Sequence, residues 1–245
     1  MRVEFPTRRE TLVAVDDVSL EIAPGEVLGM VGESGAGKTL TGLAVIGLIE
    51  PPGRIAAGEV RLEGRRIDNL PHEELRRLRG RRIGVVFQDP LTSLNPLYTI
   101  GAQLEETILT HLPLSRAGAR ARVLALLREV GIPAPELRFG HYPHQFSGGM
   151  RQRVVIALAL AAEPSLLIAD EPTTALDVSI QAQIIALLKR LARERGTAVL
   201  LITHDMGVIA ETAQRVAVMY AGRLVELGPV REVIHSPRHP YTAGL

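Results

Sequence analysis

Eight consecutive residues carry the clearest chemical signal in this chain. They follow the pattern G-x-x-x-x-G-K-T and run Gly32-Glu33-Ser34-Gly35-Ala36-Gly37-Lys38-Thr39. Glycines let backbone N–H groups curl around phosphate oxygens, and the N-terminus of a following helix favours negative charge. The Lys38 ammonium can reach the outer phosphates of a nucleotide, and the Thr39 hydroxyl can bind Mg²⁺. The pattern predicts a loop that binds a nucleoside triphosphate, and a glycine-rich turn without a ligand is the plainer alternative.

A second candidate group follows an apolar run and consists of Asp170 and Glu171. A triphosphate site needs a carboxylate at the end of a neighbouring strand to hold the metal, and hydrolysis needs a group that orients or deprotonates water. We expect Asp170 in the coordination shell of Mg²⁺ and Glu171 as the general base or as the group that positions the water. In the alternative, the pair only caps the next helix, a role that loses weight beside the phosphate loop.

The apolar pattern shows which elements position these groups. A run at 27–31 predicts a buried strand before the glycine loop, and the helical pattern after the loop extends to Ile49, where Pro51-Pro52-Gly53 ends it. The carboxylates follow a strand predicted at 165–169. Further strands are predicted at 12–22, 83–87, 198–203, 216–220 and 223–226, and a hairpin is predicted at 58–70. Helices are predicted at 72–79, 99–111, 117–130, 150–162 and 179–195.

This alternation of strands and helices predicts an α/β fold with a mostly parallel sheet that helices cover on both faces. Between Gln88 and Ser147 the pattern changes, because helical segments follow one another with no strand among them. That stretch is predicted to be a helical insertion.

Composition limits the class of protein. The chain has 245 residues, 46% of them hydrophobic and 22% charged, which is typical of a folded globular protein. A net charge of +1 does not favour a nucleic-acid partner, and the lack of cysteine excludes disulfides and thiolate metal sites. The longest uncharged apolar stretch, 154–162, is far shorter than the roughly 20 residues of a membrane-spanning helix. With no secretory pattern at the amino terminus, we expect a cytoplasmic location.

The order of the motifs resembles the ATP-binding subunit of ABC transporters over essentially the whole chain. The motifs are the glycine loop, Gln88, Ser147–Gln152, Leu167–Pro172, Ala175-Leu176-Asp177 and His204. The resemblance implies an ATPase that uses ATP and Mg²⁺. It also implies one domain over residues 1–245, with a RecA-like P-loop ATPase core at about 1–88 and 155–245, an antiparallel β subdomain, and a helical subdomain at about 89–154.

The resemblance also assigns roles to single residues. Gln88 resembles the glutamine that contacts Mg²⁺ and the attacking water, so the implied metal set is Thr39, Gln88 and Asp170. His204 resembles the switch histidine that contacts the γ-phosphate, and the implied catalytic set is Glu171, His204 and Gln88. Taken alone, Gln88 could be a surface residue after a strand and His204 a structural hydrogen-bonding group.

The run after the insertion resembles the signature sequence of the family. There the serine hydroxyl, backbone amides and helix N-terminus engage the γ-phosphate bound on the partner subunit. A plain N-cap serine with flexible glycines is the alternative, and one geometry can serve both. Asp177 resembles an aspartate of the dimer interface. The signature set is Ser147, Gly148, Gly149, Met150 and Gln152.

ATP itself is expected on the glycine loop and beside an aromatic ring. Members of the family stack adenine on an aromatic residue upstream of the loop, and only Phe5 is available there. An apolar anchor for the first strand is an equally good role for Phe5. The expected ATP-binding set is Gly32, Glu33, Ser34, Gly35, Ala36, Gly37, Lys38, Thr39, Leu40 and Phe5.

Three further segments narrow the resemblance to the peptide and nickel importer group. They are Phe87–Pro96, Tyr142–Phe146 and His239–Thr242, and Met150 is similar to the dipeptide/oligopeptide D-type subunit. ATP hydrolysis is then expected to power import of di- or oligopeptides, with a nickel-type or other small-solute importer as the alternative. The implied partners are a second, non-identical ATPase subunit, two membrane permease subunits and, indirectly, an extracytoplasmic solute-binding protein. The chain would then lie peripherally at the cytoplasmic face of the inner or plasma membrane.

Two other classes of phosphate-loop protein fit less well. A non-transport ABC ATPase of DNA repair or translation usually has tandem domains, long coiled coils or a basic nucleic-acid surface, and this sequence shows none of them, so no nucleic-acid partner is expected. A GTPase or small-molecule kinase lacks the signature, and no Asn-Lys-x-Asp motif is present. Peptide importers commonly continue into a C-terminal extension, in some cases with an iron–sulfur cluster. Its absence after His239–Thr242 suits a shorter nickel-type member or a trimmed chain.

Overall fold

The computed structural model describes residues 1–174 and 176–245, so Ala175 of the Ala175-Leu176-Asp177 motif lies outside the described residues. The chain divides into two compact units. The first unit comprises Met1–Arg76 and Ala198–Leu245, and the second comprises Arg77–Thr197. The subdomain boundaries near residues 88 and 155 stay a prediction.

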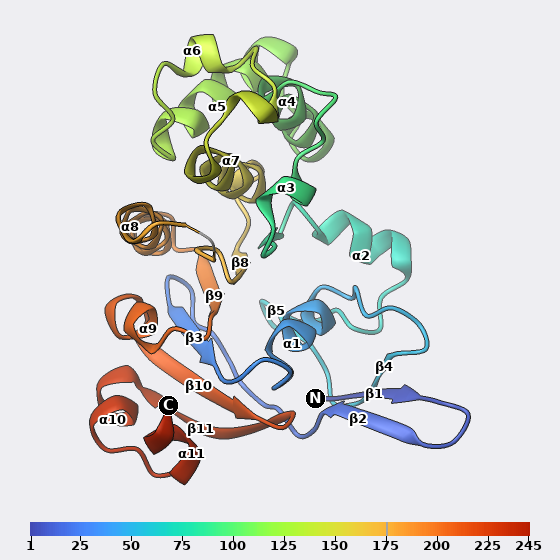
Figure 1. Ribbon diagram of the computed structural model, residues 1–245. Coiled ribbons are helices and arrows are strands. Elements are labelled where there is room, and N and C mark those ends of the chain that lie inside the picture. Colours follow the sequence, from blue (N-terminus) through green and yellow to red (C-terminus); the bar gives the residue numbers. More distant parts are fainter. Residues whose placement is uncertain (175) are drawn as a thin grey trace. The chain divides into compact units, whose positions relative to one another are not determined.

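Four strands of the first unit pair side by side (Figure 1). Their order is β11 (Arg223–Pro229), β10 (Arg215–Tyr220), β3 (Val27–Val31) and β9 (Ala198–Ile202). β3 runs parallel to β10 and β9, whereas β10 and β11 form an antiparallel hairpin. All residues of β3 and β9 are buried, which is typical of parallel strands that are covered on both faces. The α/β prediction is thereby confirmed.

Four helices of the described chain lie entirely within the first unit. They are α1 (Lys38–Val45), α9 (Met206–Thr212), α10 (Val230–His235) and α11 (Pro240–Gly244). α9 packs closely on β3, since a Cβ atom added at Gly29 would lie 2.6 Å from Cδ1 of Ile209. Gly29 therefore lets this helix approach the strand.

A small antiparallel sheet lies near the N-terminus, as predicted. Its order is β2 (Thr11–Val15), β1 (Arg2–Pro6) and β4 (Arg54–Ala57). The strand predicted over 12–22 is wrong beyond Val15, because Asp17 adopts a φ of 55°, a left-handed conformation that a strand cannot continue. β1 is not predicted by the local pattern, and its central place between β2 and β4 explains why it is extended.

Helix α1 ends at Val45, before the predicted end at Ile49. Gly47 has a φ of 64°, and the N–H groups of Gly47 and Leu48 donate to carbonyl groups of the preceding turn. This arrangement is the glycine C-cap that ends many helices. Gly47, and not the proline pair that follows, sets the end of this helix.

In chain order, β4 is followed by the hairpin strands β5 (Arg61–Leu62) and β6 (Arg65–Arg66), as predicted, and then by α2 (His72–Leu78). In the second unit, β7 (Ile83–Val86) and β8 (Leu166–Asp170) run parallel. Its helices are α3 (Pro90–Ser93), α4 (Ile100–His111), α5 (Arg116–Glu129), α6 (Pro135–Arg138), the 3-10 turn η1 (Pro143–Gln145), α7 (Gly148–Leu160) and α8 (Val178–Arg195).

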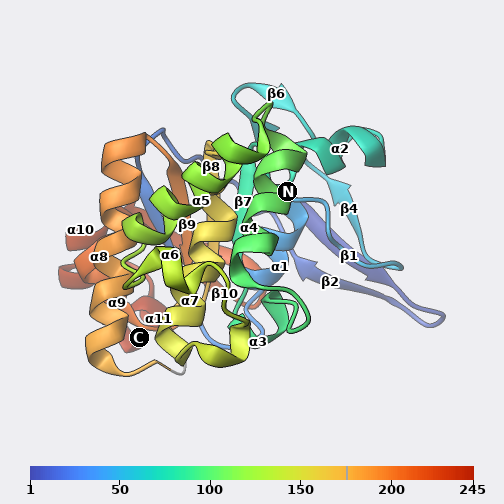
Figure 2. The same ribbon diagram turned by 90° about the horizontal axis from the view of Figure 1, so that it is seen from above.

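The long helices of the second unit pack on one another. α4, α5 and α7 lie side by side in both views (Figures 1 and 2). In the described part of the chain, no strand lies between Gln88 and Ser147, which agrees with the predicted helical insertion. None of the helices in residues 1–174 and 176–245 is both long and apolar enough to cross a lipid bilayer.

Candidate nucleotide-binding site

The glycine loop leaves β3 at Gly32 and enters α1 at Lys38, in the predicted order. Gly32 has a φ of 147°, and a Cβ atom there would lie 2.2 Å from the carbonyl oxygen of Met219 on β10. Gly37 has a φ of 97°, and a Cβ atom there would lie 3.1 Å from the carbonyl oxygen of Ala14. Both glycines of the motif are therefore required by backbone conformation and by the close approach of neighbouring backbone.

The Lys38 side chain curls back over this loop. It is 6% exposed, and Nζ donates to the carbonyl oxygens of Gly32 at 2.7 Å and Glu33 at 2.9 Å. Gly37 at the N-cap has no side chain with which to cap the first amides of α1. The positive end of the helix dipole and a buried ammonium ion thus lie at one loop, an arrangement that suits an anion such as phosphate.

His204 follows the strand next to the glycine loop. β9 pairs with β3 so that Ile202 lies opposite Met30, and the Thr203 N–H donates to the Met30 carbonyl at 3.1 Å. Because parallel strands end at one edge, exposed His204 lies at the same edge as Gly32. Its contact with a γ-phosphate stays a prediction.

In the second unit, the parallel strands β7 and β8 bring Gln88 and Glu171 together. Gln88 Nε2 donates to Glu171 Oε2 at 3.2 Å, and Thr174 Oγ1 donates to the same oxygen at 2.8 Å. Glu171 has a φ of 48°, a left-handed conformation that is uncommon for glutamate and frequent at functional turns. The sequence predicts the first two residues but not Thr174, whose only local signal is its place three residues after the carboxylate.

Asp170 precedes this pair at the end of β8, and its side chain is buried, with 7% of the residue exposed. In residues 1–174 and 176–245, no group of three or more His, Cys, Asp or Glu side chains could hold a metal ion by itself. Mg²⁺ in nucleotide sites needs only one or two protein carboxylates, since phosphate and water oxygens complete its shell. The carboxylate of Asp170 and the amide oxygen of nearby Gln88 fit such an ion.

The signature run starts helix α7. Ser147 is its N-cap, and Ser147 Oγ accepts the Met150 N–H at 3.3 Å, which is the plainer role that the sequence offers. A Cβ atom at Gly149 would lie 2.7 Å from Cγ2 of Ile180 on α8, whereas one at Gly148 would meet nothing within 4 Å. Gly149 thus permits close packing of the two helices, and Gly148 leaves space around the helix start.

Two further predicted residues differ in burial. Gln152 is 2% exposed, so its side chain packs inside the second unit. Asp177 is exposed and caps α8 by accepting the Ile180 N–H at 2.9 Å, and Val178 beside it is 84% exposed. The start of α8 therefore offers surface for a partner, whereas Gln152 does not.

Phe5 lies on β1, half-buried against a turn. A Cβ atom at Gly53 would lie 2.4 Å from Cε1 of Phe5 and 2.6 Å from Cγ2 of Ile49, so the ring edge packs on Gly53. This contact is the one expected of an apolar anchor. Stacking of Phe5 on adenine stays a prediction.

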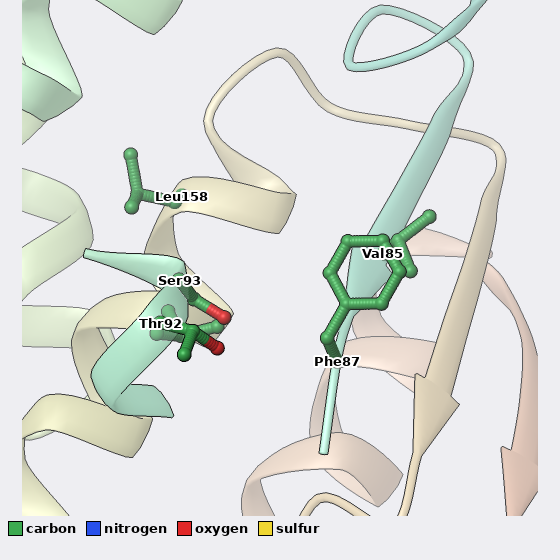
Figure 3. A pocket seen from close by; sticks show the side chains of 6 residues that line it. Val85, Phe87, Thr92, Ser93 and Leu158 are labelled. Carbon is green, nitrogen blue, oxygen red and sulfur yellow. The ribbon is translucent and has the colours of Figure 1, made fainter. Parts of the chain in front are cut away.

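A cavity of about 300 Å³ opens in the second unit beside Gln88, and we call it the Phe87 groove (Figure 3). Phe87, which is 42% exposed, and Val85 lie on one side, and Thr92 and Ser93 of α3 lie opposite them. Its lining consists of Val85, Phe87, Thr92, Ser93, Val155 and Leu158. The groove therefore offers an apolar surface edged by two hydroxyl groups.

Known proteins match most or all of this chain. A family model described as ABC transporter matches residues 15–174. A putative peptide import ATP-binding protein of Brucella ovis is 53% identical over 100% of this chain and 74% of its own. The oligopeptide transport ATP-binding protein OppD of Bacillus subtilis is 51% identical over 100% of this chain and 69% of its own. A solved dimeric ATP-binding cassette in a post-hydrolysis state, bound to ADP and Pi, aligns with a TM-score of 0.83 and 32% identity over 94% of this chain and 96% of its own.

Proposed function

This chain belongs to the ABC transporter family, and we propose that it is the ATPase subunit that powers import of di- or oligopeptides. The names of the relatives support the substrate class, and the glycine loop supports ATP binding. The observation that supports a coupling of hydrolysis to transport is the hydrogen bond between Gln88 and Glu171. It joins the carboxylate proposed for hydrolysis to a residue that directly follows Phe87 of the groove.

In the proposed ATP complex, phosphate oxygens replace the carbonyl groups that hold Lys38. Backbone amides of the loop and of the first turn of α1 donate to the phosphates, and Phe5 contacts the adenine. Thr39 on the first turn of α1, Asp170 and Gln88 are proposed to hold Mg²⁺. When bound, the ion neutralises charge on the phosphates.

Glu171 is proposed to orient the attacking water and to take its proton. The hydrogen bonds from Gln88 and Thr174 hold the carboxylate in one orientation. As the water oxygen bonds to the γ-phosphorus, the bond from that phosphorus to the β-phosphate oxygen breaks, which gives ADP and phosphate. His204 donates a hydrogen bond to the γ-phosphate in this proposal.

Two ATPase subunits are proposed to close head to tail over two ATP molecules. The start of α7, with Ser147 as cap and space around Gly148, would face the γ-phosphate on the partner. Exposed Asp177 would meet the partner at the start of α8. Buried Gln152 supports α7 from within. Met150 favours a non-identical second ATPase subunit as that partner.

The Phe87 groove is proposed to receive a short helix from a membrane permease subunit. Its lining is apolar with hydroxyl groups at one edge, which suits a few apolar side chains on one helix face. A permease subunit in the groove would contact Phe87, and Gln88 then links that contact to Glu171. This docking would hold the chain peripherally at the cytoplasmic face of the membrane, while a separate extracytoplasmic protein binds the solute.

Replacing Phe87 by alanine is expected to weaken binding to the permease subunits about 30-fold, since truncating an interface aromatic anchor costs about 2 kcal/mol. Co-purification with the membrane subunits over a range of concentrations measures the change. Leu137→Ala is the matched control, because Leu137 is 64% exposed and lies outside the groove. Equal binding of the Phe87 and Leu137 variants would place the docking surface elsewhere.

The substrate class is tested in the assembled importer. Membrane vesicles that hold both ATPase subunits, the permease subunits and the solute-binding protein are expected to take up dipeptides or oligopeptides only with ATP. Uptake of nickel ions without uptake of peptides would replace this proposal by the nickel-type importer.

A further inference from the structure

The segment His239–Thr242 has a place in the structure that none of the roles above uses. The Glu33 N–H of the glycine loop donates to the Tyr241 hydroxyl at 2.8 Å, across 208 positions of sequence. We propose that Tyr241 is a positioning residue that fixes the phosphate loop for ATP, an inference that rests on the proposed function. The hydroxyl acts through Glu33 and does not itself touch ATP.

Glu33 connects Tyr241 to Lys38, because it forms hydrogen bonds with both side chains. Its carbonyl oxygen accepts the Lys38 ammonium at 2.9 Å and the Ala36 N–H at 3.1 Å. The N–H of the same residue is held by Tyr241. One residue of the loop is thus held at both its donor and its acceptor, so the Tyr241 bond limits how far the loop that carries Lys38 can move.

Tyr241 is itself held by two contacts within the first unit. Its ring lies 4.6 Å from the ring of Tyr220, at the end of β10, with a tilt of 42°. Its N–H donates to Nδ1 of His239, the N-cap of α11. These contacts fix the position of the Tyr241 ring and therefore of its hydroxyl group beside the loop. The same strand, β10, contacts the loop at a second point, because the Met219 carbonyl oxygen would lie 2.2 Å from a Cβ atom at Gly32.

The backbone before α11 is anchored on β11. The Glu226 carboxylate accepts the N–H groups of Arg238 at 3.0 Å and His239 at 3.2 Å. Burial acts to raise the pKa of Glu226, but the interactions with the Arg238 and His239 amides, the Thr242 side chain and the Arg238 charge together lower the pKa below its ordinary value. The carboxylate is thus charged at neutral pH, and the charged form holds the segment that carries Tyr241.

Tyr241→Phe removes only the hydroxyl and keeps the ring beside Tyr220. The loop then loses one neutral hydrogen bond and is less ordered before ATP binds. Part of the binding free energy of ATP must therefore be used to order the loop. We expect KM for ATP to rise about twofold to fivefold, with kcat changed less than twofold. Amide exchange at Glu33 should become faster in the protein without nucleotide. Tyr98→Phe, which removes an exposed hydroxyl in the second unit, is the control and should match the wild type in both measurements.

The two measurements separate the possible failures. If the wild-type complex neither binds nor hydrolyses ATP, the proposed function fails, while amide exchange still reports whether Tyr241 holds the loop. If the Tyr241 variant has wild-type exchange at Glu33 and wild-type KM, the positioning role is wrong. A fall in kcat with unchanged KM also overturns it. Glu226→Ala provides a second variant, since release of the segment should raise KM in the same direction.

Discussion

ATP hydrolysis by the Glu171→Gln variant is expected to be at least about 100-fold slower than in the wild type, while ATP still binds. Glutamine keeps the length of the side chain, and its amide oxygen can accept from Gln88 and Thr174 as the carboxylate does. It cannot accept the proton of the attacking water. Loss of a positioned general base costs about 10²-fold to 10⁴-fold. Phosphate release from the assembled complex measures the rate.

Together with its partner ATPase subunit, the same variant should accumulate as a closed dimer with ATP. In the proposed cycle ATP binding favours the closed state and hydrolysis reopens it, so a subunit that binds ATP without hydrolysing it is expected to stay closed. Size-exclusion chromatography with ATP and with ADP distinguishes the two states. Glu194→Gln, at a surface carboxylate near the end of α8, is the matched control and should dissociate as the wild type does. Turnover of the Glu171 variant at the wild-type rate would remove this residue from the mechanism.

Local patterns were sufficient for the elements that hold the candidate site. The glycine loop is predicted because its spacing, the buried strand before it and the helix after it are all local features. The same holds for β8 and the carboxylates at its end. Each of these signals lies within about ten residues, the range over which apolar periodicity and capping act.

Features set by distant contacts were not predictable in this way. β1 has its extended form because it pairs with β2 and β4, and nothing in its own residues requires it. The bond from Gln88 to Glu171 joins positions 83 residues apart. The contact between Glu33 and Tyr241 spans 208 residues. All three features depend on contacts with another segment of the chain, and the apolar periodicity of one segment does not show which segment it will contact.

The signature run, Ser147–Gln152, shows that one sequence can predict a structure without deciding between two roles for it. Its sequence is compatible both with a capped helix and with a phosphate-binding surface, and the structure contains the cap at Ser147. The cap does not remove the second role, because the amides at a helix start can meet an anion on another subunit.

Lys38→Met is expected to weaken ATP binding by about 100-fold, which equals about 2.7 kcal/mol. Methionine fills similar space but carries no charge. The ammonium ion is buried and held by the carbonyl oxygens of Gly32 and Glu33, so it is already positioned where phosphates would replace these acceptors. Each of its bonds to phosphate is charge-assisted and is therefore stronger than a neutral hydrogen bond. Equilibrium binding of ATP measures the loss.

The sequence offers an unusually close control for this experiment, since Lys189 is the only other lysine. Lys189 is exposed on α8, and Lys189→Met removes the same charge from the chain without touching the glycine loop. We expect the Lys189 variant to bind ATP within about twofold of the wild type, because exposed charges are well screened at physiological salt. If both variants lose affinity equally, net charge and not the position of Lys38 sets ATP binding. If neither does, the glycine loop binds ATP through its backbone alone.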